Sequence, residues 1–152
     1  MYKASKISEQ EEQNVKDCKK IEKEVIAAMT GREEDIMNIL WNSDKPLTAK
    51  EIVDGSNGLK MNTVQACLRN LLKNGIIDIK DIVYSNTVLA RSYVPIITAE
   101  YFAAAKLTAE YNRLRDKVSK AAFVGMLLNE EDKDTQKREV DELKKLLDMY
   151  ME

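Results

Sequence analysis

The chain has 152 residues, of which 44% are hydrophobic and 33% are charged, with a formal net charge of −2; this balance excludes general disorder and favours a mostly helical globular protein. It contains no histidine, the commonest general base and metal ligand, so we expect neither an enzyme nor a bound metal or cofactor. No apolar run approaches the roughly 20 residues of a membrane span, and the charged start excludes a signal peptide, so we expect a cytoplasmic protein without membrane contact.

The first predicted element is a helix in the N-terminal extension, residues 1–29. Apolar residues recur there at three- and four-residue steps up to Met29, and such a narrow stripe suits a helix that lies on another surface. An extension that is partly frayed at its start is the alternative. The two cysteines, Cys18 and Cys67, have no metal-type spacing and occupy predicted apolar helix faces, so we expect buried thiols rather than a disulfide or a zinc site.

Three short helices are predicted after this extension. The acidic residues 33–35 open the first of them, because negative charge is favoured at helix N-termini. Thr48, followed three residues later by Glu51, forms a capping box that opens the second helix. The third begins near Asn62 and stops at Gly75, the residue type expected in the left-handed conformation after a helix.

Two strands and a helical C-terminal region complete the predicted elements. The residues from Ile77 to Tyr84 and from Val88 to Val94 are rich in β-branched and aromatic types, and the polar Ser85-Asn86-Thr87 lies between them. This pattern predicts a β-hairpin. Pro95 ends the hairpin, and a long helical region begins at Thr98. A polar, acidic break then separates this region from a last helix.

Three short helices followed by a hairpin are typical of a winged helix-turn-helix domain, whose third helix enters the DNA major groove. The sequence therefore predicts a mainly α fold, in which a winged helix-turn-helix domain with a two-stranded wing precedes a C-terminal helical dimerisation region. We expect three parts: an N-terminal helical extension (1–29), a winged-helix DNA-binding domain (30–96) and a helical dimerisation domain (97–152).

The polar side of the third helix is the candidate for reading DNA. Amides can pair with adenine, a guanidinium can pair with guanine, and an ammonium can neutralise a phosphate. No carboxylate occurs anywhere in this helix. A solvated polar face on an ordinary helix is the alternative, but the hairpin that follows favours DNA binding. The residues that share this side of the helix are Asn62, Gln65, Ala66, Arg69 and Lys73.

Further candidate contacts surround this helix. Thr63, near its start, offers a hydroxyl to a phosphate or helps to cap the helix. From Pro46 to Pro95 six basic residues face four acidic ones, whereas from residue 96 onward ten basic residues meet twelve acidic ones. The middle of the chain is thus locally positive, and its basic residues are candidates for contacts with DNA. These candidates are Lys50, Lys60, Lys80 and Arg91.

The C-terminal helices carry more apolar surface than two helices can hide against each other. A second chain is the natural place to bury such a surface, so we expect a homodimer. A monomer that folds these helices back on its own winged domain is the alternative. The residues expected at the dimer contact are Tyr101, Phe102, Leu107, Leu114, Val118, Phe123, Met126, Leu127, Leu143, Leu146 and Leu147.

Three segments resemble the penicillinase-repressor family (BlaI/MecI/CopY): REEDIMNILWNSDKPLTAKEI, NTVQACLRNLLKNGII and ARSYVP. In that family one helix ends in Trp, the next opens with Thr or Ser, and the recognition helix begins with Thr-Ile/Val-Gln and ends with Leu-Leu and Lys-x-Gly. The resemblance covers roughly residue 32 to the C-terminus. The matching residues are Trp41, Thr48, Thr63-Val64-Gln65, Leu71-Leu72-Lys73-Asn74-Gly75 and, on the wing, Arg91-Ser92-Tyr93-Val94-Pro95.

The resemblance implies a dimeric transcriptional repressor of resistance or stress genes, which binds palindromic double-stranded operator DNA and is released by a sensor protease or by an inducer. The sequence departs from the family at several places. Met61 replaces the usual Pro of the recognition helix, and Asn70 stands where a basic residue is usual, so the operator sequence is not implied. Met126-Leu127 occupies the place of the Asn-Phe bond that β-lactam-responsive members present for cleavage. The cysteine-rich motif of copper-responsive members is missing, and the N-terminal extension is unusual.

Other functions are considered beside the dimeric repressor. A protein-interaction module, in which the winged domain does not bind DNA, fits the acidic total. An enzyme is disfavoured because the sequence offers no nucleophile-base pair, no metal-ligand set and no phosphate loop. A salt-dependent gel shift separates the repressor from the interaction module.

Overall fold

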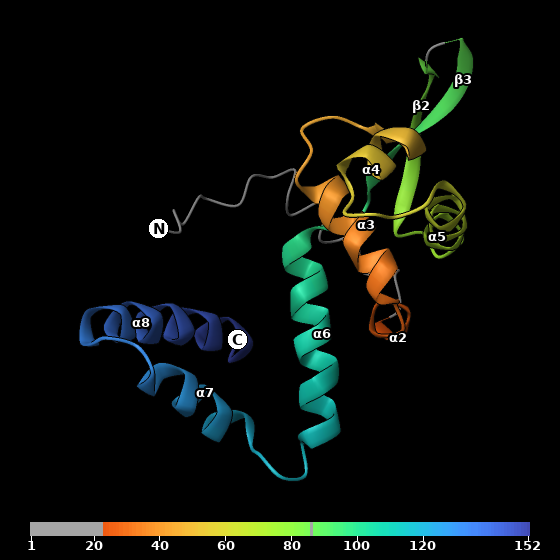
Figure 1. Cartoon of the computed structure of the whole chain (residues 1–152). Helices are drawn as coiled ribbons and strands as arrows, with labels where there is room; N and C mark the ends of the chain where they lie inside the picture. The colour runs from red at the N-terminus through yellow and green to blue at the C-terminus, as the bar shows by residue number, and fades with distance from the viewer. Residues whose placement is uncertain (1–22, 86) are drawn as a thin grey trace. The chain divides into compact units, whose positions relative to one another are not determined.

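The computed structural model describes residues 23–85 and 87–152, and it confirms the predicted winged helix followed by C-terminal helices (Figure 1). The predicted apolar stripe before residue 23, including Cys18, lies outside the described residues. The elements are α2 (Lys23–Ala27), α3 (Gly31–Trp41), β1 (Leu47–Thr48), α4 (Ala49–Gly55), α5 (Met61–Lys73), β2 (Ile77–Ser85), β3 (Val88–Pro95), α6 (Ala99–Leu114), α7 (Lys120–Asn129) and α8 (Lys133–Tyr150).

The chain divides into two compact units within α6. The first unit ends at Ala109, and the second comprises Glu110–Glu152. The first three turns of α6 therefore belong with the winged helix, although the sequence placed the whole helix in the C-terminal part. The assignment of 1–29 to an extension, of 30–96 to DNA binding and of 97–152 to dimerisation stays a prediction.

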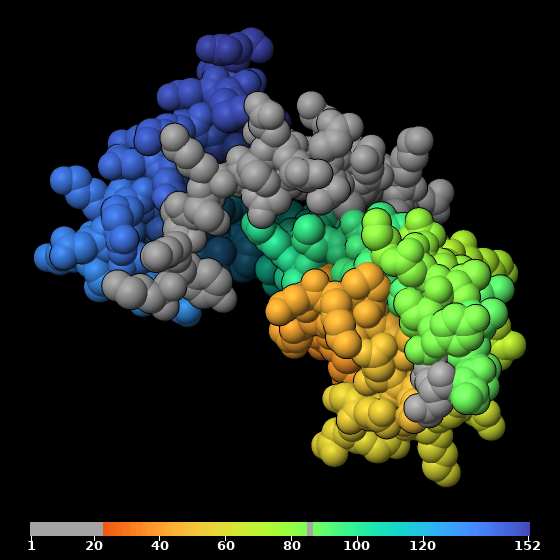
Figure 2. Space-filling view, turned by 90° about the horizontal axis from the view of Figure 1, so that it is seen from above, coloured from red at the N-terminus to blue at the C-terminus, as the bar shows by residue number. Residues whose placement is uncertain are grey.

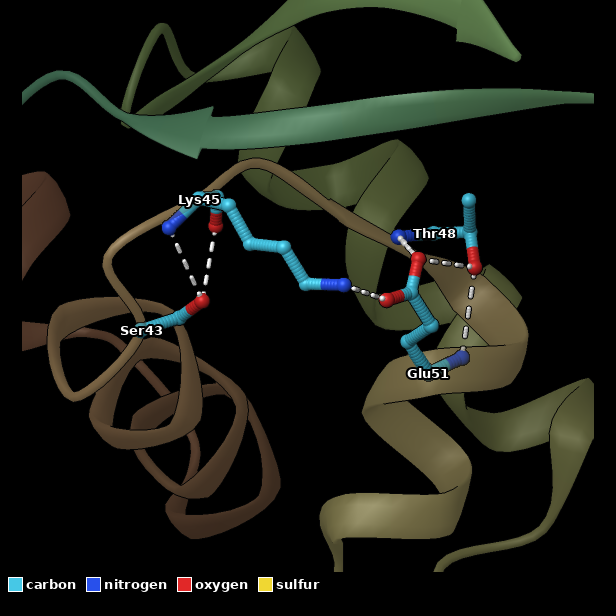
Figure 3. Close-up of polar contacts among 4 residues, drawn as sticks. All are labelled: Ser43, Lys45, Thr48 and Glu51. Carbon is cyan, nitrogen blue, oxygen red and sulfur yellow. Dashed lines mark hydrogen bonds and ion pairs between the residues drawn. The ribbon is translucent and has the colours of Figure 1, made fainter.

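The predicted capping box opens α4. The Thr48 hydroxyl accepts a hydrogen bond from the backbone N–H of Glu51 at 3.2 Å, and the Glu51 carboxylate accepts one from the backbone N–H of Thr48 at 3.2 Å (Figure 3). The ammonium of Lys45 lies 2.9 Å from the same carboxylate. The hydrogen bond from Lys45, followed by that from Thr48, lowers the pKa of Glu51 below its ordinary value. Reciprocal bonds of this kind satisfy two backbone donors that the start of a helix leaves without partners.

The end of α5 also follows the sequence. Gly75 has a φ of 73°, a left-handed conformation that glycine adopts without the steric cost of a side chain. The backbone N–H of Gly75 donates to Leu72, and that of Ile76 donates to Leu71. These bonds satisfy two of the last carbonyls of α5 and direct the chain into β2.

The hairpin belongs to a three-stranded antiparallel sheet in the order β1-β3-β2. The sequence predicted only two strands; β1 pairs Leu47 with Tyr93 and Thr48 with Ser92. A bulge lies between Ile79 and Asp81, where the hydroxyl of Ser92 bonds both the backbone N–H and the carbonyl of Asp81 at 3.1 Å. A two-residue strand carries no alternating pattern of its own, so only the finished sheet reveals it.

The core of the first unit is formed where α3, α4, α5 and the base of the sheet meet. Helices α3, α4 and α5 supply seven of the fifteen buried apolar residues in the described ranges, and α5 packs against both other helices. The end of the N-terminal extension also joins this core through Ile26 and Met29. The buried apolar residues are Ile26, Met29, Ile36, Met37, Leu40, Leu47, Ile52, Val64, Leu68, Leu71, Ile76, Ile77, Ile97, Phe102 and Ala105.

The start of α6 is fixed to α3 by three contacts. The indole N–H of Trp41 donates to the carbonyl of Ile97 at 2.8 Å, and the Trp41 ring lies 5.2 Å from that of Phe102. The ammonium of Lys106 contacts Glu34 at 2.7 Å and lies 5.4 Å above the Phe102 ring. Phe102 is buried in this core, so we correct its assignment to the dimer contact; Tyr101 packs against the same core.

Replacing Trp41 by phenylalanine tests this junction. The substitution keeps an aromatic ring beside Phe102 but leaves the carbonyl of the buried Ile97 without its donor. An unsatisfied buried acceptor costs about 1–3 kcal/mol, so we expect the free energy of unfolding to fall by about that amount. Urea denaturation followed by circular dichroism measures it, and an unchanged midpoint would show that the hydrogen bond contributes nothing.

The second unit contains the last turn of α6, α7 and α8. The predicted helical region from Thr98 is interrupted between Leu114 and Lys120, where the Tyr111 hydroxyl donates to the carbonyl of Val118 at 2.9 Å. Side-chain caps then restart the helices: Ser119 caps α7 and Asp132 caps α8. None of the helices in the described ranges combines the length and the apolar character needed to cross a membrane.

Candidate DNA interface

The two sides of α5 differ sharply in polarity. Val64, Leu68 and Leu71 are buried against the first unit, and residues at three- and four-residue steps on the opposite side face solvent. We call this opposite side the polar face of α5. All five of its residues are exposed: Asn62, Gln65, Ala66, Arg69 and Lys73.

The polar face of α5 carries positive charge that no acidic residue of the described ranges pairs with. The helix contains no carboxylate, and the ion pairs within the described part of the chain join Lys45 to Glu51, Lys106 to Glu34 and Arg113 to Glu110. Arg69 and Lys73 take part in none of these pairs. Their donors are therefore available to an external acceptor.

The first turn of α5 lacks the side-chain cap that the helices α3, α4, α6, α7 and α8 possess. Its N-cap residue is Lys60, whose side chain makes no capping hydrogen bond, and its first turn contains no acidic residue. A cation at a helix N-terminus is unfavourable because the helix dipole is positive there. By contrast, the first turns of α3, α4, α6, α7 and α8 each donate a backbone hydrogen bond to a hydroxyl or carboxylate side chain. These capping residues are Thr30, Thr48, Thr98, Ser119 and Asp132.

The C-terminal half of α5 is anchored to the start of α3. Glu33 is only 6% exposed, and its carboxylate accepts a hydrogen bond from the side-chain amide of Asn70 at 2.9 Å. A buried carboxylate needs such a donor. Asn70 and Arg69 are both exposed, but the side-chain amide of Asn70 is engaged by Glu33 on α3. No local pattern predicts this pair, because the two residues are 37 positions apart.

The other predicted DNA contacts are distributed around α5. Lys50 on α4 and Lys60 before α5 are exposed, and Thr63 is half-buried at the flank of the polar face. Lys80 and Arg91 are exposed on β2 and β3. The hairpin extends away from the helices of the first unit (Figure 1).

Cys67 lies on the inner flank of α5 as a free, half-buried thiol. Burial raises the pKa of this thiol, and the nearby charge of Glu33 raises it further, while Arg32 acts in the opposite direction. The neutral thiol is the less reactive form. This agrees with the structural role expected for Cys67. Within the described ranges no cluster of potential metal ligands is present.

The second unit exposes a large apolar surface. Not one residue of α7 or α8, both of which the structure describes in full, is buried. Val118 and Leu143 are half-buried, and the Phe123 ring stacks on Tyr111 at 6.0 Å. The remaining residues predicted for the dimer contact are exposed: Leu107 in the first unit, and Leu114, Phe123, Met126, Leu127, Leu146 and Leu147 in the second.

Three packed helices, a sheet with a projecting hairpin and an outward polar face on α5 define a protein of the winged helix-turn-helix class. The sequence model of the Penicillinase repressor family matches residues 29–149. The chain belongs to the penicillinase repressor family, and this confirms the resemblance found in its sequence. The family is one of transcriptional repressors. A comparison with curated proteins found no match.

Proposed function

We propose that this chain represses transcription as a homodimer that binds palindromic operator DNA through α5. The observation that carries the proposal is the polar face of α5, which is exposed along its length and contains no carboxylate. A helix of this kind can enter the major groove without repulsion from the phosphates on either side.

The residue types of the polar face fit base edges. Asn62 and Gln65 can each pair with the N6 and N7 groups of adenine, and Arg69 can donate two hydrogen bonds to the O6 and N7 groups of guanine. The small Ala66 between them permits close approach and can contact a thymine methyl group. Lys73, at the end of the helix, is placed to neutralise a phosphate. These contacts together would specify a short half-site.

Phosphates would fix the position of α5 in the groove. The uncapped first turn of α5 offers backbone N–H groups, and Lys60 beside it adds positive charge, a combination that suits a phosphate. Thr63 can add a hydroxyl donor, and Lys50, Lys80 and Arg91 are candidates for the flanking backbone. A phosphate at this position would also supply the negative charge that the start of α5 lacks.

The apolar surface of the second unit supports the proposed dimer. Helices that bury no residue of their own have no core as a monomer, and a two-fold contact between identical apolar surfaces supplies one. Two copies of α5 related by this symmetry would read two inverted half-sites, which is a palindromic operator.

Fluorescence anisotropy with duplex DNA from the region upstream of the gene tests the proposal. We expect tight binding at low salt, a fall in affinity that is linear in the logarithm of the salt concentration, and much weaker binding to a duplex of scrambled sequence. Absence of binding at low salt would contradict the repressor and favour a protein-interaction module.

Replacing Lys60 by serine should change stability and DNA affinity in opposite directions. Serine caps the first turn of α5, which we expect to raise the free energy of unfolding by about 1 kcal/mol. The loss of one phosphate contact per subunit should weaken DNA binding and reduce the salt slope by about one per subunit. Urea denaturation and salt-dependent anisotropy measure the two effects. Lys117→Ser, at an exposed position of the second unit, is the matched control, and unchanged DNA binding by Lys60→Ser would remove Lys60 from the interface.

A further inference from the structure

The outer half of the hairpin is a separate structural feature of the first unit. Strand β1 pairs with β3 only at Ser92 and Tyr93, so beyond these residues the hairpin has two strands. Within residues 23–85 and 87–152, no strand pairs with the outer part of either edge. Figure 1 shows this part projecting past the helices. We call residues 82–84 and 88–91 the outer hairpin.

Apart from Arg91 at its base, both faces of the outer hairpin are apolar. Tyr84 lies opposite Leu89, and Ile82 lies opposite Arg91; because opposite residues share a face, these residues form one side. Val83 and Val88 belong to the other side by the same alternation. Ile82, Tyr84, Val88 and Leu89 are 60–76% exposed. The space-filling view shows green atoms of β2 and β3 uncovered on the side toward the viewer (Figure 2).

Such a surface is unexpected in a part of the fold that commonly lies near DNA. Contacts with the phosphate backbone require basic or polar donors, yet no charged residue occurs between Asp81 and Arg91. A projecting two-stranded hairpin is also only marginally stable in water. Exposed apolar patches of this kind mark sites of protein contact. The chemistry of the outer hairpin therefore fits an apolar, uncharged partner better than it fits DNA.

We propose that the outer hairpin binds the outer hairpin of a second copy of the chain. Apart from Arg91 at the base of the outer hairpin, the two identical surfaces carry no charge, and a two-fold contact brings the same apolar side chains together. The free edge of β3 from Val88 to Arg91 can add main-chain hydrogen bonds to its counterpart. This contact is separate from the apolar surface of the second unit.

The consequence is a second level of assembly. If the second units form the proposed dimer, the hairpins join two dimers, and DNA that carries two neighbouring operators would be occupied cooperatively. This consequence rests on the proposed function, whereas the hairpin contact itself does not require DNA.

Sedimentation velocity over a wide range of protein concentration tests the contact. We expect the full chain to show one association step beyond its smallest oligomer, and Leu89→Asp to remove that step. A leucine contributes about 1.5–3 kcal/mol on burial, and it is used twice in a two-fold contact. We therefore expect Leu89→Thr, which keeps a residue suited to a strand, to lower the association constant by roughly 100-fold. Asn38→Asp adds the same charge at an exposed position of α3 and should leave the step unchanged.

The outcomes separate this proposal from the proposed function. Absence of a further association step, or a step that Leu89→Asp does not alter, overturns the hairpin contact. A weaker affinity of Leu89→Asp for a single operator, with assembly unchanged, would show that the hairpin contacts DNA instead. If the wild-type chain assembles as expected but binds no DNA, the proposed function alone fails.

Discussion

Arg69→Ala is expected to abolish most sequence-specific binding to the operator. A two-pronged contact between arginine and guanine contributes about 1–3 kcal/mol to discrimination, and a dimer makes it twice. The summed loss of about 2–6 kcal/mol corresponds to a fall in affinity from roughly 30-fold to more than 10³-fold. Anisotropy titrations at fixed salt measure the loss of affinity and the loss of specificity separately, if they use both the duplex from the region upstream of the gene and a duplex of scrambled sequence.

The matched control for Arg69→Ala is Arg115→Ala, which removes the same charge from an exposed position outside α5. Arg115→Ala should change binding little, because a single exposed charge outside the proposed contacts acts only through screened electrostatics. Binding by Arg69→Ala that equals that of the wild type would remove α5 from the interface and support an interaction module.

Breaking the dimer should have a comparable effect on operator binding. Met126 on α7 is 65% exposed and Leu147 on α8 is 61% exposed, so the double variant Met126→Asp/Leu147→Asp places charges on the apolar surface without disturbing a core. In sedimentation equilibrium we expect the contact between second units to be lost, so that the double variant is monomeric at protein concentrations below those at which the outer hairpins associate. Each subunit would then bind a half-site alone and lose the effective concentration that the partner provides, which weakens operator binding by roughly 10²–10⁴-fold.

Lys145→Asp is the control for the double variant. It adds negative charge to an exposed position of α8, on the side of the helix opposite Leu147. It should remain dimeric and should bind the operator like the wild type. A double variant that stays dimeric would show that the two chains associate elsewhere, for example through the outer hairpin or through the winged units.

The elements that the sequence predicted correctly carry local signals. Thr48 and Glu51 are three residues apart and cap their own helix, and Gly75 ends α5 through its own backbone conformation. The polar face of α5 is also a local property, because exposure follows from a single helical period once the buried side is known. The order of the elements also follows from these local patterns and does not depend on the resemblance to the family.

The features that the sequence missed depend on partners far along the chain. Strand β1 exists only because Leu47 meets Tyr93, and the side-chain amide of Asn70 donates to Glu33 on another helix. Phe102 has the same apolar character as Phe123, but only the structure shows that it packs on Trp41 in the core. The apolar character of a residue predicts that it is buried, but it does not predict whether it packs in the core of its own chain or against a second chain.

The uncapped start of α5 and the apolar outer hairpin have sequence signals that are ambiguous on their own. Lys60 stands where a capping residue is favoured, and the stretch from Ile82 to Leu89 has no charge. Both become informative only in the structure. There, side chains cap the helices α3, α4, α6, α7 and α8, whereas α5 has no side-chain cap, and the apolar residues of the outer hairpin are exposed. Local rules that are broken without compensation within the chain are expected at functional sites.

Methylation interference on the operator tests the central claim most directly. Methyl groups on guanine N7 lie in the major groove, and methyl groups on adenine N3 lie in the minor groove. We predict that N7 methylation blocks binding at one guanine or more in each of two inverted half-sites, and that Arg69→Ala no longer senses methylation at one of these guanines. Interference confined to adenine N3, or the same N7 pattern for Arg69→Ala and the wild type, would contradict the reading of the major groove by α5.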